Sequence, residues 1–260
     1  MQALRTAATG MSAQQLNVEV ISNNIANMNT VGFKKQRAEF QDLLYHTLER
    51  AGAQAAEGAI VPTGVQIGGG VKAGSVYRIT EQGAVTQTGN PYDLAIEGRG
   101  FFQVLMPSGE NAYTRAGNLS LNADGQLVTE DGYAIQPAIN VPGDATAISV
   151  SKTGQVQAVR AGQTEAEVVG QIELANFVNE AGLNAIGDNL LMETAASGPA
   201  NVGAPGAAGF GNLLQGYTEA SNVDAVTEIT ALIVAQRAYE MNSKVISAAD
   251  EMLQAANSVK

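Results

Sequence analysis

The sequence predicts an α+β protein: N- and C-terminal heptad helices that pair as a coiled coil, with a central antiparallel β-rich domain. The first observation behind this prediction is where the residues that interrupt helices fall. All seven prolines lie between Pro62 and Pro205, and 24 of the 29 glycines lie in residues 61–211. The two ends are therefore free to form long helices, whereas the middle has the frequent turns of β structure. The other observations are seven-residue apolar repeats at both ends and short alternating runs between them.

The first helix is expected over residues 3–28, because apolar and small residues recur there every seven positions. One row of this repeat contains Leu4, Met11, Val18 and Ile25, and the row three positions later contains Ala7, Gln14, Ile21 and Met28. So narrow an apolar stripe at a terminus favours a helix that associates with other helices. The alternative is an ordinary amphipathic helix packed on its own domain.

A cluster of asparagines marks the end of this helix. In the stretch SNNIANMNTVGF, four of them precede Gly32 and Phe33, namely Asn23, Asn24, Asn27 and Asn29. Asparagine tolerates left-handed backbone conformations and hydrogen-bonds to its own backbone, so we expect the cluster to stop the helix and shape a compact turn. Whether these amides also bridge to a neighbouring subunit stays open at this point.

The next segment, residues 33–75, is expected to connect the first helix to the β-rich domain. Its first part, FKKQRAEFQDLLYHTLERAG, suggests a shorter helical or mixed element with four apolar residues on one side, namely Phe40, Leu43, Leu44 and Leu48. From Gln54 to Gly74 the apolar periodicity is too weak for a helix, and an extended loop with at most one strand is expected.

Residues 76–193 are expected to form the β-rich domain. Short apolar or alternating runs recur there at the spacing of an antiparallel, Greek-key or barrel-like fold. The Asp-Gly pairs at 124–125 and 131–132 have the chemistry of tight hairpin turns. Residues 194–217, which are rich in glycine, alanine and proline, are expected to be a linker.

The last helix is expected to begin near Ser221, because Ser221 and Asp224 match an S-x-x-D capping box. Large residues then recur every seven positions, namely Leu232, Tyr239, Ile246 and Leu253. Alanines and one asparagine follow three positions after them, and such small residues let another helix approach closely. Residues 1–32 and 218–260 are therefore predicted to form one discontinuous coiled-coil domain.

Charge and composition exclude several classes of function. The net charge is −11, and residues 81–210 carry 4 basic and 14 acidic groups. An acidic protein of this kind is a poor ligand for nucleic acid or an anionic membrane, which require basic patches. There is no cysteine, and neither a cleavable signal peptide nor a membrane-spanning run is evident.

Candidate catalytic residues are scarce. His46 is the only histidine and has no partner nearby in the sequence, so triad and histidine–metal chemistry are disfavoured. The glycines at 68–70 are not followed by the lysine and helix start of a phosphate loop. The acids of the middle region sit beside turn glycines. We therefore predict a non-enzyme with no catalytic residues, no cofactor and no metal, and keep a cell-wall hydrolase or a monomeric cell-wall binding module as alternatives.

Five blocks of the sequence are more specific than these patterns. They are SNNIANMNTVGFKK at 22–35, RAEFQDLLY at 37–45, DLAIEGRGFFQV at 93–104, YTRAG at 113–117 and GYTEASNVDAVTEITALIVAQRAYEMNSKVI at 216–246. In these blocks, and over essentially its whole length, the chain resembles the flagellar rod and hook family of axial proteins. Residues 52–72, with Gly52, Pro62, Gly64 and Gly68, favour the distal rod over the proximal rod or the hook.

The resemblance implies a structural subunit that self-assembles through its terminal helices into a straight, rigid helical tube. Such a tube transmits motor torque to the hook and encloses the export channel. The implied partners are further copies of the chain, proximal rod and hook subunits, the P-ring and L-ring bushing, the rod cap and the export apparatus. The implied location is the bacterial flagellar basal body, from the periplasmic space to the outer membrane, reached without a cleaved signal peptide.

Overall fold

The computed structural model of the chain describes residues 2–49, 54–56, 59–60, 63–162 and 165–258. Two terminal helices and a large antiparallel β-rich body confirm the α+β class. The chain forms two compact units. Unit 1 comprises Met1–Ala26, Gln36–Tyr77 and Asp224–Lys260, and unit 2 comprises Asn27–Lys35 and Arg78–Val223.

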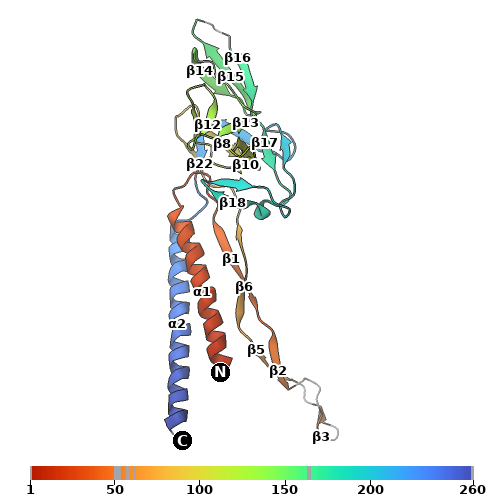
Figure 1. Cartoon of the computed structure of the whole chain (residues 1–260), viewed down its shortest axis with the longest axis vertical. Helices are drawn as coiled ribbons and strands as arrows, with labels where there is room; N and C mark the ends of the chain where they lie inside the picture. The colour runs from red at the N-terminus through yellow and green to blue at the C-terminus, as the bar shows by residue number, and fades with distance from the viewer. Residues whose placement is uncertain (1, 50–53, 57–58, 61–62, 163–164, 259–260) are drawn as a thin grey trace. The chain divides into compact units, whose positions relative to one another are not determined.

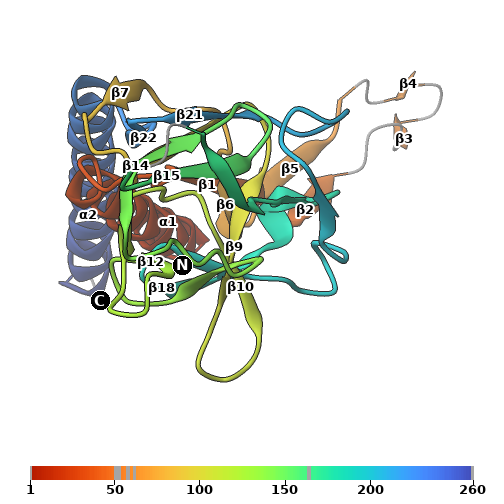
Figure 2. The same ribbon diagram turned by 90° about the horizontal axis from the view of Figure 1, so that it is seen from above.

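The two helices of unit 1 are α1 (Gln2–Ala26) and α2 (Ala225–Ser258), which lie side by side in both views (Figures 1 and 2). Neither contains a proline, and alanine is frequent in both, which favours long uninterrupted helices. Their axes approach closely at Gly10, where an added Cβ would lie 2.9 Å from Nδ2 of Asn242. Gly10 of α1 therefore leaves the space that the Asn242 side chain of α2 occupies.

Unit 1 also contains three two-stranded ribbons, which pair β1 with β6, β2 with β5, and β3 with β4 (Figure 1). Their strands are β1 (Gln36–Asp42), β2 (Tyr45–Glu49), β3 (Gln54–Ala56), β4 (Ala59–Ile60), β5 (Val65–Gly68) and β6 (Val71–Arg78).

The prediction of a helical or mixed element after Phe33 was wrong, because residues 36–49 are β1 and β2. The expectation of at most one strand between Gln54 and Gly74 was also wrong, since that segment contains β3, β4, β5 and the start of β6. The physical reason is non-local: the two parts of the segment pair with each other. Backbone bonds from Leu43 N–H to the Gly70 carbonyl (2.8 Å) and from Gly69 N–H to the Leu44 carbonyl (3.1 Å) join them.

Unit 2 is built from antiparallel strand pairs. A nine-stranded sheet has the order β11-β12-β13-β9-β10-β19-β18, with β17 pairing both β9 and β20. This order has two ends, so the described strands of the sheet do not close into a barrel. The strands of this sheet are β9 (Phe101–Leu105), β10 (Asn111–Thr114), β11 (Leu119–Leu121), β12 (Leu127–Thr129), β13 (Ala134–Gln136), β17 (Leu174–Asn176), β18 (Asn184–Gly187), β19 (Leu190–Met192) and β20 (Asn201–Gly203).

Smaller sheets complete unit 2. β14, β15 and β16 form a three-stranded sheet, while β8 pairs with β21 and β7 with β22. Their bounds are β7 (Val85–Gln87), β8 (Leu94–Glu97), β14 (Ala145–Val150), β15 (Gln155–Arg160), β16 (Glu167–Gln171), β21 (Asn212–Gln215) and β22 (Tyr217–Glu219), and a short 3-10 helix covers Glu180–Gly182.

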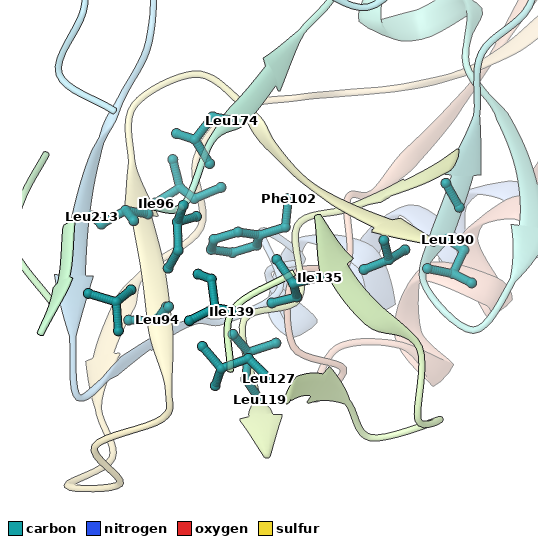
Figure 3. Close-up of a cluster of buried hydrophobic side chains, with 14 residues drawn as sticks. Leu94, Ile96, Phe102, Leu119, Leu127, Ile135, Ile139, Leu174, Leu190 and Leu213 are labelled. Carbon is teal, nitrogen blue, oxygen red and sulfur yellow. The ribbon is translucent and has the colours of Figure 1, made fainter. Parts of the chain in front are cut away.

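The hydrophobic core of unit 2 lies around β9, which is buried on both faces. Phe102 and Val104 point into the main cluster, where the Phe102 ring lies among leucine and isoleucine side chains (Figure 3). Phe101 points the other way, as successive residues of a strand do. It joins Tyr113 and Phe177, whose rings meet edge to face at 4.8 Å between centroids. β9 is thus the central strand of unit 2.

The segment 194–217 contains more structure than the expected linker. β20 pairs with β17, β21 pairs with β8, and Leu213 is fully buried in the main cluster. Short strand pairing is compatible with a composition rich in glycine and alanine when a partner strand is already in place.

The predicted capping box of the last helix is out of register. α2 begins at Ala225, and the Asp224 carboxylate accepts the backbone N–H of Thr227 at 3.2 Å. Asp224 is therefore the N-cap itself. Ser221 instead accepts the backbone N–H of Val223.

Replacement of Phe102 by alanine tests the placement of the core. Because this ring is completely buried, Phe102→Ala should lower the free energy of unfolding by about 3–5 kcal/mol. Val178→Ala is the control, since Val178 is 92% exposed and should change stability by less than about 0.5 kcal/mol. Denaturant unfolding measures both, and equal effects would contradict this core.

Candidate assembly site

The residues predicted for self-assembly on α1 are mostly buried or half-buried. Ile21 is buried, and the others on the helix, namely Leu4, Met11, Val18 and Ile25, are half-buried. Met28 lies beyond the end of α1 and is exposed. Two further buried residues of α1, Ala13 and Val20, were not predicted from the sequence. Their signal was their seven-residue spacing.

On α2, small residues are buried and the large ones of the predicted repeat are only partly covered. Ala235 and Ala249 are buried, Leu232 and Ile246 are half-buried, and Tyr239 and Leu253 are each 42% exposed. Further large apolar side chains of α2 are exposed to solvent, namely Val226, Ile229, Ile233, Val234, Met241, Val245 and Met252. Unit 1 therefore leaves a considerable apolar surface on α2 uncovered.

The side chain of Asn24 hydrogen-bonds to two other segments of unit 1. Its Oδ1 accepts the backbone N–H of Gln36 at 2.8 Å, and its Nδ2 donates to the Gln36 carbonyl at 2.8 Å and to Oε2 of Glu228 at 3.1 Å. The end of α1, the first residue of β1 and the first turns of α2 thus meet at one buried amide. The amide does not bond to its own backbone, so the expected turn-shaping role is wrong for Asn24.

The turn itself belongs to unit 2 and depends on Gly32. Among the described residues of the motif only Gly32 has a left-handed backbone, with φ of +71°, and none of the four asparagines does. A Cβ on Gly32 would lie 2.7 Å from the backbone of Arg115 and Ala116. The carbonyl oxygen of Asn27 accepts the backbone N–H of Thr30, and its Oδ1 accepts the Thr30 hydroxyl. Asn23 and Asn29 are exposed, and Phe33 is half-buried.

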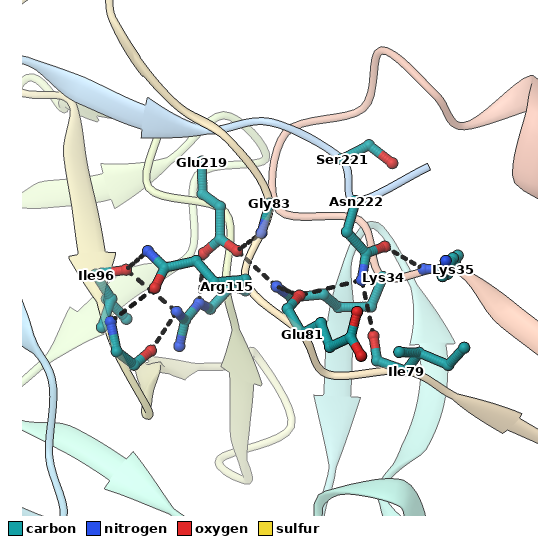
Figure 4. Close-up of polar contacts among 12 residues, drawn as sticks. Lys34, Lys35, Ile79, Glu81, Gly83, Ile96, Arg115, Glu219, Ser221 and Asn222 are labelled. Carbon is teal, nitrogen blue, oxygen red and sulfur yellow. Dashed lines mark hydrogen bonds and ion pairs between the residues drawn. The ribbon is translucent and has the colours of Figure 1, made fainter. Parts of the chain in front are cut away.

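Next to this turn lies a buried carboxylate, that of Glu219, whose backbone carbonyl accepts the Gly32 N–H (Figure 4). Its Oε1 lies 2.5 Å from Nζ of Lys34 and also accepts the backbone N–H of Gly83 at 2.8 Å. Its Oε2 lies 2.6 Å from Nε of Arg115. Its side chain is completely buried, and those of Lys34 and Arg115 are 8% and 7% exposed. We call these three residues the Glu219 cluster.

The cations of the Glu219 cluster use their remaining hydrogens on backbone carbonyls. Arg115 donates to the carbonyls of Ile96, Gly98 and Gly100, and Lys34 donates to that of Glu81 at 2.7 Å. A buried ion pair is stable only when its other donors and acceptors are also satisfied. These contacts meet that condition, and they join segments of unit 2 that are far apart in the sequence.

Burial and the neighbouring charges shift the pKa values of Glu219 and Lys34. Burial alone would raise the pKa of the Glu219 carboxyl, but the charge of Arg115 and the hydrogen bonds from Lys34 and Arg115 hold that pKa below its ordinary value of 4.5. Burial lowers the pKa of the Lys34 ammonium from 10.5, and Glu219 opposes this effect.

Asn222 has the same role in unit 2 that Asn24 has in unit 1: its side-chain amide hydrogen-bonds to the backbone of other segments of its own unit. Its Oδ1 accepts the backbone N–H of Lys35 at 2.7 Å, and its Nδ2 donates to the carbonyls of Ile79 and Glu81. Lys35 and Ile79 also bond directly through their backbones at 2.9 Å. In each unit, one amide side chain thus hydrogen-bonds to backbone segments that lie, in the sequence, next to a point where the chain passes from one unit to the other.

The segment predicted to be specific to the distal rod is only partly described. Gly52 and Pro62 lie outside the described residues. Gly64 precedes β5 and is half-buried, and Gly68 ends β5, opposite Tyr45 of β2. An added Cβ on Gly68 would contact the Tyr45 ring at 3.4 Å.

Within the described residues, no group of three or more His, Cys, Asp or Glu side chains is placed to hold a metal ion. His46 is exposed on β2. Neither described helix combines the length and apolar character needed to cross a membrane.

Three family models match successive parts of the chain. The flagella basal body rod protein model matches residues 4–34, the flagellar hook protein FlgE/F/G D1 domain matches 95–158, and the flagellar basal body rod FlgEFG protein C-terminal model matches 214–259. The flagellar basal-body rod protein FlgG of Caulobacter vibrioides is 71% identical over 261 residues, which cover all of both chains. This chain belongs to the FlgG family of flagellar basal-body rod proteins.

The FlgG family extends to distant organisms. The FlgG of Agrobacterium fabrum is 54% identical over 97% of both chains, and that of Bacillus subtilis is 42% identical over 98% of this chain and 97% of its own. The basal-body rod protein FlgF of Caulobacter vibrioides is only 34% identical, over 92% of this chain and 89% of its own. FlgG-family membership confirms the prediction of a structural subunit of the flagellar rod.

The sequence reasoning did not identify the Glu219 cluster or Asn222. All four residues nevertheless lie inside the sequence blocks that carry the family resemblance: Lys34 in the first, Arg115 in YTRAG, and Glu219 and Asn222 in GYTEASN.

Replacement of Glu219 by glutamine tests the cluster. Glu219→Gln leaves Lys34 and Arg115 buried without a counter-charge, so it should lower the free energy of unfolding by about 3–5 kcal/mol at pH 7. Glu167→Gln is the control, because the Arg160–Glu167 pair is exposed and should contribute about 1 kcal/mol or less. Equal losses in the two variants would contradict a buried cluster.

The same two proteins, wild type and Glu219→Gln, give a pH test. The folded-state pKa of Glu219 lies below its ordinary value of 4.5, so the stability that depends on its charge is present above pH 4.5. It is lost as the pH falls from 4.5 through the folded-state pKa, because the unfolded chain takes up the proton first. The stability difference between the two proteins, measured by denaturant unfolding, should therefore shrink below pH 4.5. A constant difference down to pH 3 would exclude this role.

Proposed function

We propose that this protein is the subunit of the flagellar distal rod, and that it assembles into a straight, rigid helical tube. The observation that carries the proposal is the contrast within one organism: 71% identity to FlgG over the full length against 34% to FlgF. Rod-family membership implies a structural rather than an enzymatic role. The same contrast disfavours the position of FlgF in the rod.

In this proposal, assembly occurs through the discontinuous coiled-coil domain, residues 1–32 and 218–260, around the export channel. The exposed apolar side chains of α2 support it, because a monomer gains nothing by leaving so many of them in water. Contacts between two different surfaces of identical subunits propagate as an open helix when their rotation does not close. Residues 33–75 would connect this domain to the β-rich domain 76–193 and the segment 194–217.

The proposed neighbours are further copies of the chain, proximal rod subunits, hook subunits, the rod cap, the export apparatus and the P-ring and L-ring bushing. The tube would cross the periplasmic space to the outer membrane after export without a cleaved signal peptide. Torque transmission requires stiffness, and the Glu219 cluster supports it. A fully satisfied buried ion pair holds one geometry, because each of its groups loses its partner when the geometry changes.

Complementation tests the proposal. In a Caulobacter vibrioides strain that lacks its FlgG, expression of this chain should restore swimming, and purified basal bodies should carry straight rods of normal length by electron microscopy. Caulobacter vibrioides FlgF, expressed at the same level from the same promoter, is the control and should not restore swimming. Stable expression without any rod, or with curved tubes, would contradict a distal rod function.

We also propose that residues 52–72 act as a strut that contacts adjacent subunits and keeps the rod straight. β2 and β5 support this, because they form a ribbon that bears exposed Tyr45, Leu48, Val65 and Ile67. Deletion of residues 52–72 should give rods that bend, measured as a fall in persistence length in electron micrographs. A Gly/Ser replacement of the same length is the matched control for chain length and should bend as well. Straight rods from both variants would contradict the strut.

A further inference from the structure

Unit 2 contains a pocket with a volume of about 580 Å³, inside the range of about 300–1,000 Å³ that is typical of ligand pockets. Three segments line it: residues 121–125, residues 141–143 with 145–148 of β14, and residues 91–92. None of these residues belongs to the Glu219 cluster or to the terminal helices. The pocket therefore has no part in the roles described above.

Hydrogen bonds fix the first wall of the pocket, the turn at residues 122–125. Oδ1 of Asn122 accepts the backbone N–H of Asp124 at 3.0 Å and that of Gln126 at 2.8 Å. The carbonyl of Gly125 accepts the backbone N–H of Val141 at 2.8 Å, and a Cβ on Gly125 would collide with the Val141 carbonyl. The turn is thus held directly against the start of the second wall.

Gln215 fixes the other two walls to each other. Its Nε2 donates to the carbonyl of Pro91 at 2.8 Å and to that of Ile148 at 2.9 Å, and its Oε1 accepts the backbone N–H of Val150 at 2.9 Å. The segment with Tyr92 is thereby attached to β14. A pocket whose walls are already held in place loses less conformational entropy when a ligand binds.

The free polar groups of this pocket favour a ligand that donates hydrogen bonds. Asp124 is the only charged residue that lines the pocket, and no donor among the described residues reaches its carboxylate. The Thr146 hydroxyl donates to the Val159 carbonyl at 3.0 Å, so its lone pairs stay available to a ligand. Since no Lys, Arg or His lines the pocket, an anionic ligand is disfavoured.

Apolar surface lies beside these acceptors. Tyr92 packs against the main hydrophobic cluster, which fixes its ring, and Pro91 and Pro142 also line the pocket. A sugar ring combines hydroxyl donors with a face of C–H groups, so it matches an aromatic ring next to free acceptors. A lysine side chain of another protein matches less well, because an ion pair with the exposed Asp124 would contribute little free energy.

We propose that this pocket binds a neutral oligosaccharide, with a sugar ring against Tyr92 and hydroxyls that donate to Asp124 and Thr146. This binding site is additional to the structural role proposed above and does not depend on it. The glycan strands of the cell wall and free oligosaccharides share this chemistry, and the experiment below distinguishes the two sources.

NMR titration of the purified chain with chitotetraose tests the site. The backbone amide signals of residues 121–125 and 145–148 should shift. Asp124→Ala should weaken binding about tenfold or more, because a hydrogen bond to a charged acceptor is lost. It leaves the bonds of the turn in place, since the Asn122 side chain makes them. Asp131→Ala is the matched control, because Asp131 is also exposed before a turn glycine but does not line the pocket.

A second pair of variants tests the aromatic contact. Tyr92→Leu keeps apolar volume against the core but removes the ring, and it should weaken binding about three- to tenfold. Tyr133→Leu is the control, because Tyr133 packs on the same hydrophobic cluster and does not line the pocket. Thermal unfolding checks that both variants fold. Equal affinities for the two variants would overturn the placement of the sugar against Tyr92.

The choice of ligand separates the remaining outcomes. Pocket signals that do not respond to chitotetraose would overturn the proposal, and a response to tetralysine alone would indicate a basic protein partner instead. Sedimentation with isolated peptidoglycan sacculi then identifies the source. Sacculus-dependent sedimentation that Asp124→Ala reduces would assign the site to cell-wall glycan, whereas chitotetraose binding without it would assign the site to free oligosaccharides.

Discussion

One buried carboxylate, that of Glu219, holds several segments of unit 2 in their arrangement. Glu219 neutralises two cations that come from segments widely separated in the sequence. Arg115 also donates to carbonyls at the end of β8 and in the turn that follows it, and Lys34 donates to the Glu81 carbonyl. Removal of the carboxylate would leave two positive charges where water cannot reach them. The turn at Gly32, residues 81–83 and the end of β22 are consequently held in one arrangement, since Glu219 bonds to Lys34 and Gly83 and Lys34 bonds to the Glu81 carbonyl.

Unit 1 relies on a neutral group for the equivalent task. Asn24 uses its donor and its acceptor on the backbone of Gln36 and its second donor on Glu228. A carboxamide suits this position because it satisfies a backbone N–H and a carbonyl at the same residue without bringing a charge into the helix contact. The buried residues of α2 are small, namely Ala235 and Ala249, so most of its large apolar residues stay exposed.

The sequence alone predicts the helices well and the connecting ribbons poorly. The heptad spacing at both ends and the absence of proline there are local signals, and α1 and α2 follow them within a few residues. Residues 36–49 carry apolar spacing compatible with a helix, and it is their pairing with residues 65–78 that makes β1 and β2 of them. Asp224 took the N-cap position from Ser221 because its carboxylate reaches the N–H of Thr227. The Glu219 cluster could not be predicted, since no local pattern relates residues 34, 115 and 219.

The spacing of the Glu219 cluster along the chain has a consequence for biogenesis. Lys34 and Arg115 leave the ribosome long before Glu219. Their side chains therefore have no counter-charge with which to be buried until nearly the whole chain has been synthesised. Closing loops of that length is also slow compared with local structure formation. The Glu219 cluster therefore closes late in synthesis, and only the contacts that need α2, which follows Glu219 in the chain, can form after it.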